Sequence, residues 1–239
     1  MNASGLILLI PDKPDGERDA VANAWEHHGG KVLRLGRFWD PPALEANCVR
    51  IYGSTSFVLV LRDKLGFDLC TPADDLILSL PPEALKRRIQ KRRLEEAEHF
   101  QYPLFVKPVI PKLFAARVYA SLVVLRRECQ GLGGDTAVLT SAVVSFVAEA
   151  RTFILDSEAL DCALYEGDGN VQEAAADFAR SQFLPRTLVL DVGLIKNQGW
   201  AVIELNAAWG AGLNGCQAER KWPSIAAASG PQNDKPVRY

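Results

Sequence analysis

Two acidic side chains and one amide stand out near the end of the sequence, in the stretch LVLDVGLIKNQGWAVIELNAAWG at residues 188–210. Asp191 belongs to the first of two apolar runs, and Glu204 and Asn206 belong to the second. In both runs polar and apolar positions alternate, which is the period of a β-strand. A polar turn at residues 196–199 joins the runs, so the stretch predicts a hairpin with these three polar side chains on one face.

The chemistry of such a face depends on how close the two acids lie. A symmetric turn would put Asp191 opposite Glu204, with Cβ atoms about 5 Å apart, and would make Asn206 a diagonal neighbour. Like charges in that arrangement destabilise a sheet unless a cation lies between them. Two carboxylates, an amide carbonyl and open positions for water and phosphate are typical of a Mg²⁺ nucleotide site rather than a Zn²⁺ or Ca²⁺ site.

The alternative is that both acids are solvated on the outer face of an antiparallel sheet, and the spacing alone does not decide between the two interpretations. The residues after the hairpin favour a ligand. Small side chains surround Trp209 there and would let backbone N–H groups approach a bound molecule. These small residues are Ala207, Ala208, Gly210, Ala211, Gly212 and Gly215.

A second group of candidates is basic. Lys107 lies within the apolar stretch LFVKPVI, where a lysine must reach solvent or pair with an anion such as phosphate. The alternative is an edge-strand lysine that reaches water, which the following Pro108 would fit. Lys112 and Arg117 follow within the next ten residues and could bind the same anion.

Glu149 and Arg151 alternate with small residues in the stretch AVVSFVAEARTF. The alternation places both side chains on one face of a predicted strand. They can face a ligand together, or they can simply pair with each other at the surface.

The elements that must position these residues follow from periodicity and turn signals. Residues 6–10, 31–35 and 49–52 predict strands, and residues 17–28 and 57–65 predict helices, which together begin an α/β layer. A long helix is expected from residue 82 to about 99, including the basic run KRRIQKRR. Beyond it we expect strands in LFVKPVI, ARVYASLVVL, TAVLTSAVVSFVAEARTFIL and residues 160–165, and a helix at 172–183.

Composition excludes several classes of function. The chain has 239 residues, of which 48% are hydrophobic, and a net charge of −2, so it can bury a core but has no general field for nucleic acid or an anionic membrane. Five scattered cysteines without metal-ligand spacing predict reduced, mostly buried thiols. No stretch is long enough to predict a membrane span, and the apolar run at the start is too short for a signal peptide, so we expect a cytoplasmic protein.

Taken in order, FVKP, SAVVSFVAEARTF, LDVG and ELNAAWG resemble the ATP-grasp superfamily over about residues 83–216. Within it the chain is similar to a compact clade found in bacteria and their phages. The resemblance implies an α+β protein with the ATP-grasp fold, in which two α+β lobes clamp ATP, preceded by a small α/β pre-ATP-grasp domain. We therefore expect a pre-ATP-grasp domain at 1–82, an ATP-grasp domain at 83–225 and a tail at 226–239.

The resemblance also implies roles for individual residues. Lys107 matches the lysine that contacts the α- and β-phosphates, and Arg151 matches a strand arginine that faces the active site. Glu149 falls where an acid is often near the ribose or the substrate. The adenine-binding hinge matches Ser141, Ala142, Val143 and Val144, and the magnesium-binding set matches Asp191, Glu204 and Asn206.

One departure from the family is the loop PVIPKLFAAR after the phosphate lysine, which contains no glycine. Lys112 and Arg117 would have to replace the backbone amides that a glycine-rich loop offers to phosphate. A second ATP lysine earlier in the chain is not assigned among Lys86, Lys91 and their arginine neighbours.

The activity that the resemblance implies is a Mg²⁺- and ATP-dependent carboxylate–amine ligase that forms an amide through an acyl phosphate, with Lys107, Arg117 and Arg151 as catalytic residues. Its substrates would be small-molecule or peptide carboxylates and amines. They would be selected by the N-terminal domain and by loops near Tyr165 and Trp209. An ATP-grasp kinase or phosphotransferase and a non-catalytic nucleotide-binding module are the alternatives, and the sequence does not indicate an oligomeric state.

Overall fold

A computed structural model describes residues 2–180 and 184–231. The chain folds into two compact units that do not follow the sequence order. Unit 1 comprises Met1–Pro72, Ala148–Val192 and Glu204–Tyr239, and unit 2 comprises Ala73–Val147 and Gly193–Ile203.

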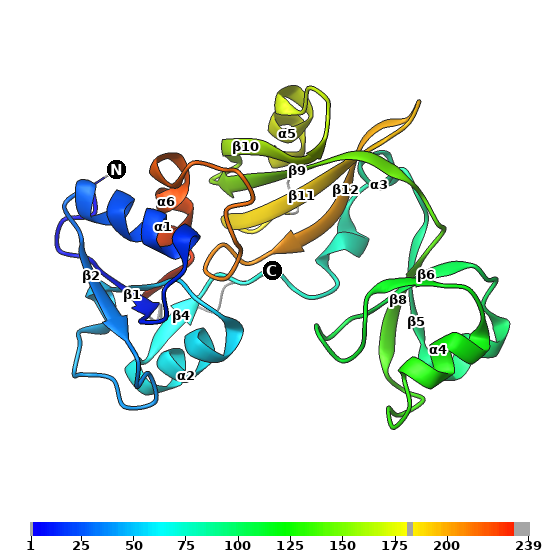
Figure 1. The fold of residues 1–239 in the computed structure, drawn as a ribbon, viewed down its shortest axis with the longest axis horizontal. Helices are drawn as coiled ribbons and strands as arrows, with labels where there is room; N and C mark the ends of the chain where they lie inside the picture. Colours follow the sequence, from blue (N-terminus) through cyan, green and yellow to red (C-terminus); the bar gives the residue numbers. More distant parts are fainter. Residues whose placement is uncertain (1, 181–183, 232–239) are drawn as a thin grey trace. The chain divides into compact units, whose positions relative to one another are not determined.

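The N-terminal part of unit 1 has three layers. A parallel sheet of order β2-β1-β3 lies in the middle, with α1 and α6 on one face and α2 on the other (Figure 1). Trp25 of α1 packs edge-on against Trp222 of α6, with ring centroids 5.7 Å apart, and Phe57 and Leu61 of α2 fill the opposite side. The elements are β1 (Ile7–Pro11), α1 (Gly16–His27), β2 (Lys31–Leu35), β3 (Val49–Ile51), α2 (Thr55–Leu65) and α6 (Ala218–Ala227).

These helices begin and end where local sequence signals predict. The side chain of Asp15 accepts a hydrogen bond from the backbone N–H of Arg18 at 2.9 Å and caps α1. Ser54 caps the start of α2, and Gly66 ends it with a left-handed backbone at φ 68°. The predicted α/β layer is therefore confirmed.

A second sheet has the order β10-β9-β11-β12, and α5 packs against β10. The predicted hairpin is present, because β11 and β12 are neighbours joined by a turn in which Gln198 N–H donates to the carbonyl of Ile195 at 3.0 Å. The expected helix at 172–183 corresponds to α5, and residues 181–183 lie outside the described chain. The bounds are β9 (Phe146–Leu155), β10 (Glu158–Gly167), α5 (Gln172–Ala179), β11 (Thr187–Ile195) and β12 (Gly199–Asn206).

The predicted tail at 226–239 lies only partly within the described residues. The end of α6 and the strand β13 (Ser229–Pro231) occupy its beginning, and β13 pairs antiparallel with β4 (Phe67–Leu69). Residues 232–239 lie outside the described chain.

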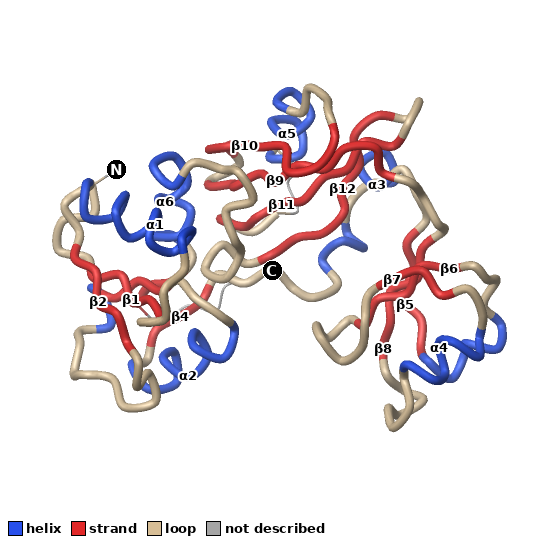
Figure 2. Tube along the Cα trace, in the orientation of Figure 1, coloured by secondary structure: helices blue, strands red, loops and turns tan. Residues whose placement is uncertain are grey.

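Unit 2 is built on an antiparallel sheet of order β5-β8-β6-β7 (Figure 2). Its core contains Val106, Phe114, Tyr119, Leu125 and Val138, so α4 packs on the face that carries Val106 and Val138. The bounds are β5 (Ile89–Arg93), β6 (Leu104–Pro108), β7 (Arg117–Tyr119), α4 (Leu122–Glu128) and β8 (Ala137–Ser141).

The long helix predicted from residue 82 to about 99 is wrong. Helix α3 (Pro82–Leu85) ends at Lys86, whose φ of 49° is left-handed, and the basic run continues as β5 and a 3₁₀ turn at Leu94–His99. The i, i+4 charge pairing that suggested a helix is used otherwise. Arg92 donates to Glu96 at 2.6 Å from the end of a strand that β8 pairs along its whole length.

Two smaller expectations also need correction. The stretch ARVYASLVVL forms only the short strand β7 before α4 begins, because Ser121 caps that helix by accepting from the N–H of Val124. Lys107 does not lie on an edge strand, since β6 runs between β8 and β7. Pro108 marks the end of β6, as expected.

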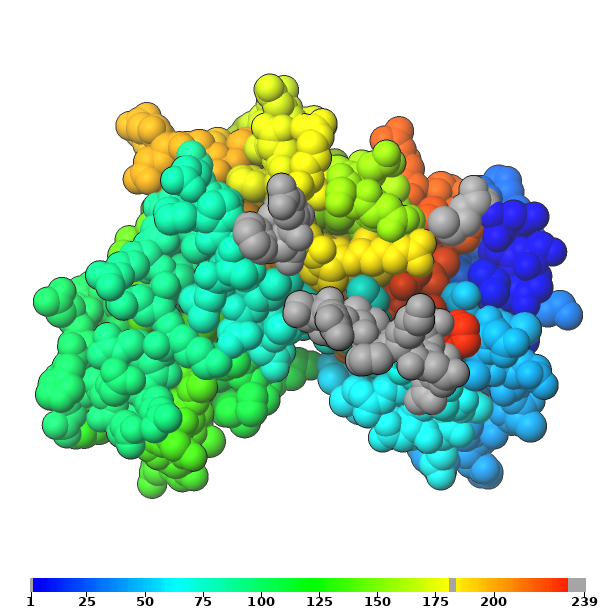
Figure 3. Space-filling model, turned by 180° about the vertical axis from the view of Figure 1, so that it is seen from behind, coloured from blue at the N-terminus to red at the C-terminus, as the bar shows by residue number. Residues whose placement is uncertain are grey.

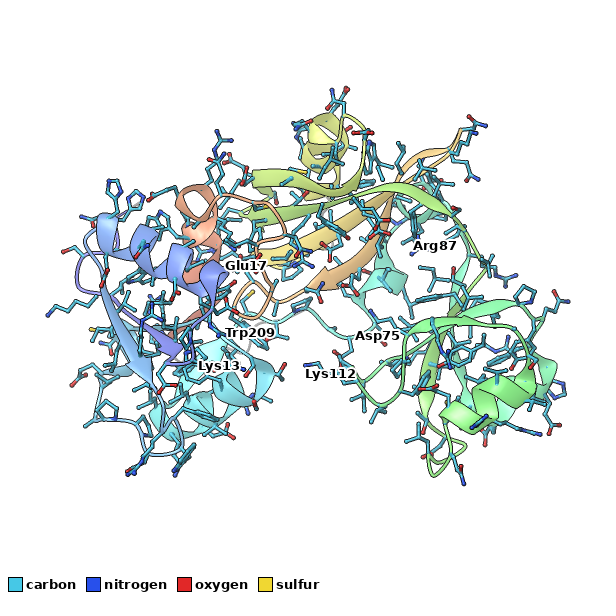
Figure 4. The ribbon with its side chains drawn as sticks, in the orientation of Figure 1. Lys13, Glu17, Asp75, Arg87, Lys112 and Trp209 are labelled. Atoms are coloured by element: carbon cyan, nitrogen blue, oxygen red, sulfur yellow. The ribbon has the colours of Figure 1, made fainter. Side chains whose placement is uncertain are left out.

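The tip of the β11–β12 hairpin groups with unit 2, where α3 holds it. Lys86 Nζ donates to the carbonyl of Gln198, and the orange tip lies beside the teal α3 segment in Figure 3. Arg87 donates to the carbonyl of Val202 at 2.8 Å and stacks over the ring of Phe146 at 5.5 Å (Figure 4). These contacts fix the outer end of the hairpin.

The five cysteines are free, as expected, although only Cys129 and Cys216 are buried. Among residues 2–180 and 184–231, no helix has both the length and the apolar character that a membrane crossing requires.

Candidate active site

The strongest polar contact in unit 1 joins Arg151 of β9 to Asp191 of the neighbouring strand β11. Arg151 Nε donates to Asp191 Oδ1 at 2.8 Å, and Nη2 donates to Oδ2 at 2.6 Å. Asp191 is only 2% exposed. A paired hydrogen bond of this kind fixes both the position and the plane of the guanidinium.

Asn206 links the two acidic side chains of the hairpin. Its Nδ2 donates to Glu204 Oε1 at 2.9 Å and to Asp191 Oδ2 at 3.3 Å. The structure therefore brings together the three side chains that the sequence predicts as metal ligands. The alternative of two solvated acids is wrong for Asp191, which is buried.

The charge of this cluster is balanced differently from the sequence expectation. We expected the two carboxylates to repel each other without a cation. In the structure Arg151 covers both oxygens of Asp191, and Asn206 donates to both acids, so protein groups supply the compensating positive charge. Arg151 comes from β9, which lies beyond the hairpin, and its pairing with Asp191 could not be read from the hairpin alone.

Burial shapes the protonation of the pair. Burial raises the pKa of the Asp191 carboxyl above its usual value, although the hydrogen bonds from Arg151 oppose that shift. For Arg151, burial disfavours the charged form, but the hydrogen bonds to Asp191 outweigh it and its pKa lies above the usual value. Arg151 therefore keeps its charge inside the cluster.

The donor set fits magnesium. Two carboxylates and an amide oxygen are hard ligands of the type that Mg²⁺ prefers. Among the described residues there is no group of three or more His, Cys, Asp or Glu side chains that would suit a softer or more highly coordinated metal. To ligate a cation, Asn206 would turn its amide to present Oδ1, and Asp191 would release at least one oxygen from Arg151.

Glu149 lies two residues before Arg151 on β9. Its Oε2 accepts a hydrogen bond from the hydroxyl of Tyr165 on β10 at 2.8 Å. The alternative that Glu149 pairs with Arg151 is not what the structure shows, because Arg151 bonds to Asp191 and Gly212. Burial, followed by the hydrogen bond to Glu149, raises the pKa of Tyr165, so this hydroxyl stays protonated and donates.

The small-residue segment after Asn206 packs against the N-terminal layers of unit 1. Trp209 Nε1 donates to the hydroxyl of Thr71 at 3.0 Å, and the carbonyl of Trp209 accepts from the N–H of Gly53 at 2.9 Å. The hydroxyl of Tyr52 donates to the carbonyl of Ala211 at 2.8 Å. The segment is therefore a fixed wall beside the acidic cluster.

In unit 2, the strand register places Lys107 in a row with a second lysine. Lys107 of β6 and Lys91 of β5 both pair with Leu139 of the intervening strand β8. Paired residues share a face, so the two lysines lie on one face roughly 10 Å apart, which is two strand spacings. Ser141 lies on the same face, and Lys91 Nζ contacts Asp75 Oδ2 at 2.7 Å.

The other predicted residues of unit 2 lie apart from this row. Arg117 pairs with Val106, whose side chain is on the opposite face of the sheet from Lys107, and it donates to Glu128 at 2.7 Å. The structure therefore does not bring Arg117 together with Lys107. Lys112 is exposed in the loop after β6, and the predicted hinge at 141–144 leaves β8 as irregular chain that leads into β9.

Sequence reasoning missed three residues of interest. Lys91 was one of several unassigned basic residues, and only the pairing of β5 with β8 separates it from the others. Glu17 read only as part of a helix, although it contacts the backbone of Leu213 at 2.8 Å across 196 residues of sequence. Lys221 is 0% exposed in α6, and its polar character within an apolar pattern was the one available signal.

The fold and the acidic cluster define an ATP-grasp protein. The model for the second family of a named clade of ATP-grasp domains matches residues 85–221. The chain belongs to this ATP-grasp family, and the resemblance noted from the sequence motifs is confirmed.

Solved structures show the same fold over nearly the whole chain. The ATP-grasp ligase PsnB, solved with its precursor peptide PsnA2 and AMPPNP, is 11% identical, with 95% of this chain and 98% of that chain covered and a TM-score of 0.58. A RimK domain protein ATP-grasp from Sphaerobacter thermophilus DSM 20745 is 13% identical, with 92% and 97% covered and a TM-score of 0.61.

The D-cycloserine synthetase DcsG is 11% identical, with 93% of this chain and 99% of that chain covered and a TM-score of 0.61. At these identities the likenesses establish the fold and not the substrate. No curated protein matches the sequence.

Proposed function

We propose that the protein is an ATP- and Mg²⁺-dependent carboxylate–amine ligase. The observation that carries the proposal is the cluster of Arg151 with Asp191, Glu204 and Asn206 in a chain of the ATP-grasp family. An arginine beside a set of hard oxygen ligands suits the transfer of a phosphoryl group, because negative charge must be stabilised on the oxygens of that group.

The reaction has two steps in this proposal. An oxygen of the substrate carboxylate attacks the γ-phosphorus of ATP, the bond to the β-phosphate oxygen breaks, and ADP and an acyl phosphate form. The amine then attacks the acyl carbon, loses a proton and displaces phosphate to give the amide. Magnesium, when held by Asp191, Glu204 and Asn206, would neutralise the β- and γ-phosphate oxygens.

The chain's own groups have separate roles. Arg151 binds the transferring phosphoryl group or the substrate carboxylate through two parallel hydrogen bonds. Lys107 binds the α- and β-phosphates, and we assign Lys91 as the second phosphate lysine because the sheet register places it in the same row. Glu149, oriented by Tyr165, binds the ribose or the substrate.

Substrate class follows only in outline. PsnB was solved with a precursor peptide, and DcsG is a synthetase of a small molecule. We propose a peptide or small-molecule carboxylate as the acceptor of phosphate and an amine as the second substrate, in the cytoplasm.

The test traps the acyl phosphate. Hydroxylamine replaces the unknown amine, and pools of amino acids, short peptides and other carboxylates are incubated with Mg-ATP. A ligase yields a hydroxamate together with equal amounts of ADP and phosphate. ADP with a stable phosphorylated product and no hydroxamate would identify a kinase, and ATP binding without ADP formation in every pool would contradict catalysis. Glu204→Gln serves as the inactive control.

A further inference from the structure

One peptide bond near the acidic cluster is held on both sides by charged side chains. The carbonyl of Gly212 accepts from Arg151 Nη1 at 3.0 Å. The N–H of Leu213, in the same peptide unit, donates to Glu17 Oε2 at 2.8 Å, and the N–H of Asn214 donates to Glu17 Oε1 at 3.1 Å. Figure 4 shows Glu17 on α1 directed toward the segment that also carries Trp209.

Gly212 is required for this close approach. A Cβ atom at Gly212 would lie 2.6 Å from Glu17 Oε2 and 3.8 Å from Arg151 Nη1. The carboxylate and the guanidinium therefore approach the same residue, and any side chain there would displace Glu17 first. The backbone conformation of Gly212 does not itself demand glycine, since its φ is not positive.

Arg151 has three hydrogen bonds, which a bound cation would divide. Two go to Asp191, and one goes to the carbonyl of Gly212. When Asp191 gives its oxygens to a cation, the bond to Gly212 is the contact of these three that continues to orient the guanidinium. A guanidinium held at one nitrogen keeps a defined direction only if its acceptor is itself fixed.

We propose that Glu17 is a positioning residue for Arg151. Glu17 holds the Gly212–Leu213 peptide, the carbonyl of Gly212 holds Arg151 Nη1, and Nε and Nη2 of Arg151 exchange Asp191 for the transferring phosphoryl group. The inference rests on the proposed function for that last exchange. Glu17 itself touches no reacting atom.

The charge of Glu17 adds to its geometric effect. A carboxylate that accepts from a peptide N–H polarises the peptide and makes its carbonyl oxygen a stronger acceptor. The bond from Arg151 to Gly212 is therefore strengthened by the negative charge on the other side of the same peptide. Glu17, Gly212 and Arg151 all belong to unit 1, so the relay lies within one compact part of the molecule.

The first experiment observes Arg151 directly in the ligand-free protein. The side-chain ¹⁵Nε–H resonances of arginine are recorded by NMR, and the signal of Arg151 is identified by its loss in Arg151→Lys. Glu17→Ala should shift and broaden this signal. Gly212→Ala should do the same while keeping the Glu17 charge, because the new methyl group displaces the carboxylate.

The matched control is Asp19→Ala. Asp19 is the other acid in the first turn of α1, and it pairs with Arg34 at 2.7 Å away from the relay. Its removal has the same effect on the helix dipole as the removal of Glu17 and should leave the Arg151 signal unchanged.

The second experiment separates positioning from a merely structural role. Glu17→Ala and Gly212→Ala should lower kcat for phosphate release from Mg-ATP by about tenfold or more, with KM for ATP unchanged within about threefold. Glu17→Gln should recover part of kcat, because its Oε1 can accept one of the two N–H bonds. An Arg151 signal or a kcat indifferent to both substitutions would overturn the inference. A wild-type protein that does not bind Mg-ATP would instead contradict the proposed function.

Discussion

Arg151 and Asp191 form a buried, doubly hydrogen-bonded ion pair on neighbouring strands, with N–O distances of 2.8 and 2.6 Å. The pair changes what should happen when the predicted metal ligands are altered one at a time. Mutual repulsion of Asp191 and Glu204 alone would make either neutral variant more stable without metal. The ion pair makes the two positions unequal.

Asp191→Asn should destabilise the metal-free protein by about 2 kcal/mol or more, because it leaves the buried guanidinium of Arg151 without its anion. Glu204→Gln should leave the metal-free stability within about 0.5 kcal/mol, since Glu204 is half-buried and its bond from Asn206 can be kept. Both should abolish turnover. Urea unfolding in the presence of a chelator measures the difference, and equal effects at the two positions would contradict this account.

Arg151→Lys should lower turnover about 100-fold or more, because an ammonium cannot make two parallel hydrogen bonds to a phosphoryl or carboxylate group. ATP affinity should stay within about threefold, since the guanidinium acts mainly when charge moves to the acceptor. Steady-state phosphate release and calorimetric titration with ATP give the two numbers. Full turnover, or a loss of ATP binding as large as for Lys107→Ala, would assign Arg151 a structural role only.

Lys107→Ala should weaken ATP binding by about 2 kcal/mol, the scale of one charge-assisted hydrogen bond, with little change in ligand-free melting temperature. Lys91→Ala should act in the same direction if the lysine row binds phosphates together. Lys31→Ala, at an exposed position in β2, is the control. An ATP affinity that survives the loss of Lys107 would show that this lysine serves only the sheet.

Lys221 provides a pH-dependent test of the core of unit 1. Its Nζ is buried 4.3 Å from the ring centroid of Phe153 without a hydrogen-bond partner, and burial lowers its pKa to about 7. The unfolded chain binds the proton more tightly than the folded protein between that value and the usual lysine pKa. Stability therefore rises with pH from about 7 toward about 10, and the full penalty is present below pH 7.

Lys221→Met should accordingly stabilise the protein at neutral pH by about 1–3 kcal/mol. The advantage should shrink as the pH rises toward about 10, where the wild-type amine is neutral in both states. Chemical unfolding of the two proteins across this range, with Lys31→Met as the exposed control, measures it. A gain that does not depend on pH would mean that Lys221 is not held as the amine at neutral pH.

The hairpin could be predicted from the sequence because its signals are local. Alternation and a short polar turn bring Asp191, Glu204 and Asn206 together within twenty residues of chain. Arg151 was identified by its motif, but its pairing with Asp191 depends on β9 lying next to β11, a neighbour relation that no local pattern encodes. Glu17 and Lys91 escaped for the same reason, since only tertiary contacts and strand register set them apart from other charged surface residues.

The misread helix at 82–99 shows the same limit from the other side. Glu and Arg residues spaced four apart favour a helix, yet pairing of β5 with the distant strand β8 decides the structure. Sequence reasoning thus identified most of the candidate chemistry and misplaced an element that carries part of it.

The most direct test of the central claim is a crystal structure with Mg²⁺ and a non-hydrolysable ATP analogue. We predict a magnesium ion bound by oxygens of Asp191, Glu204 and Asn206 at about 2.1 Å, with the amide of Asn206 turned to present Oδ1. Nε and Nη2 of Arg151 should have left Asp191 for the γ-phosphate, with Nη1 still on Gly212. A nucleotide bound with its metal elsewhere, or with both Arg151–Asp191 hydrogen bonds intact, would contradict the account.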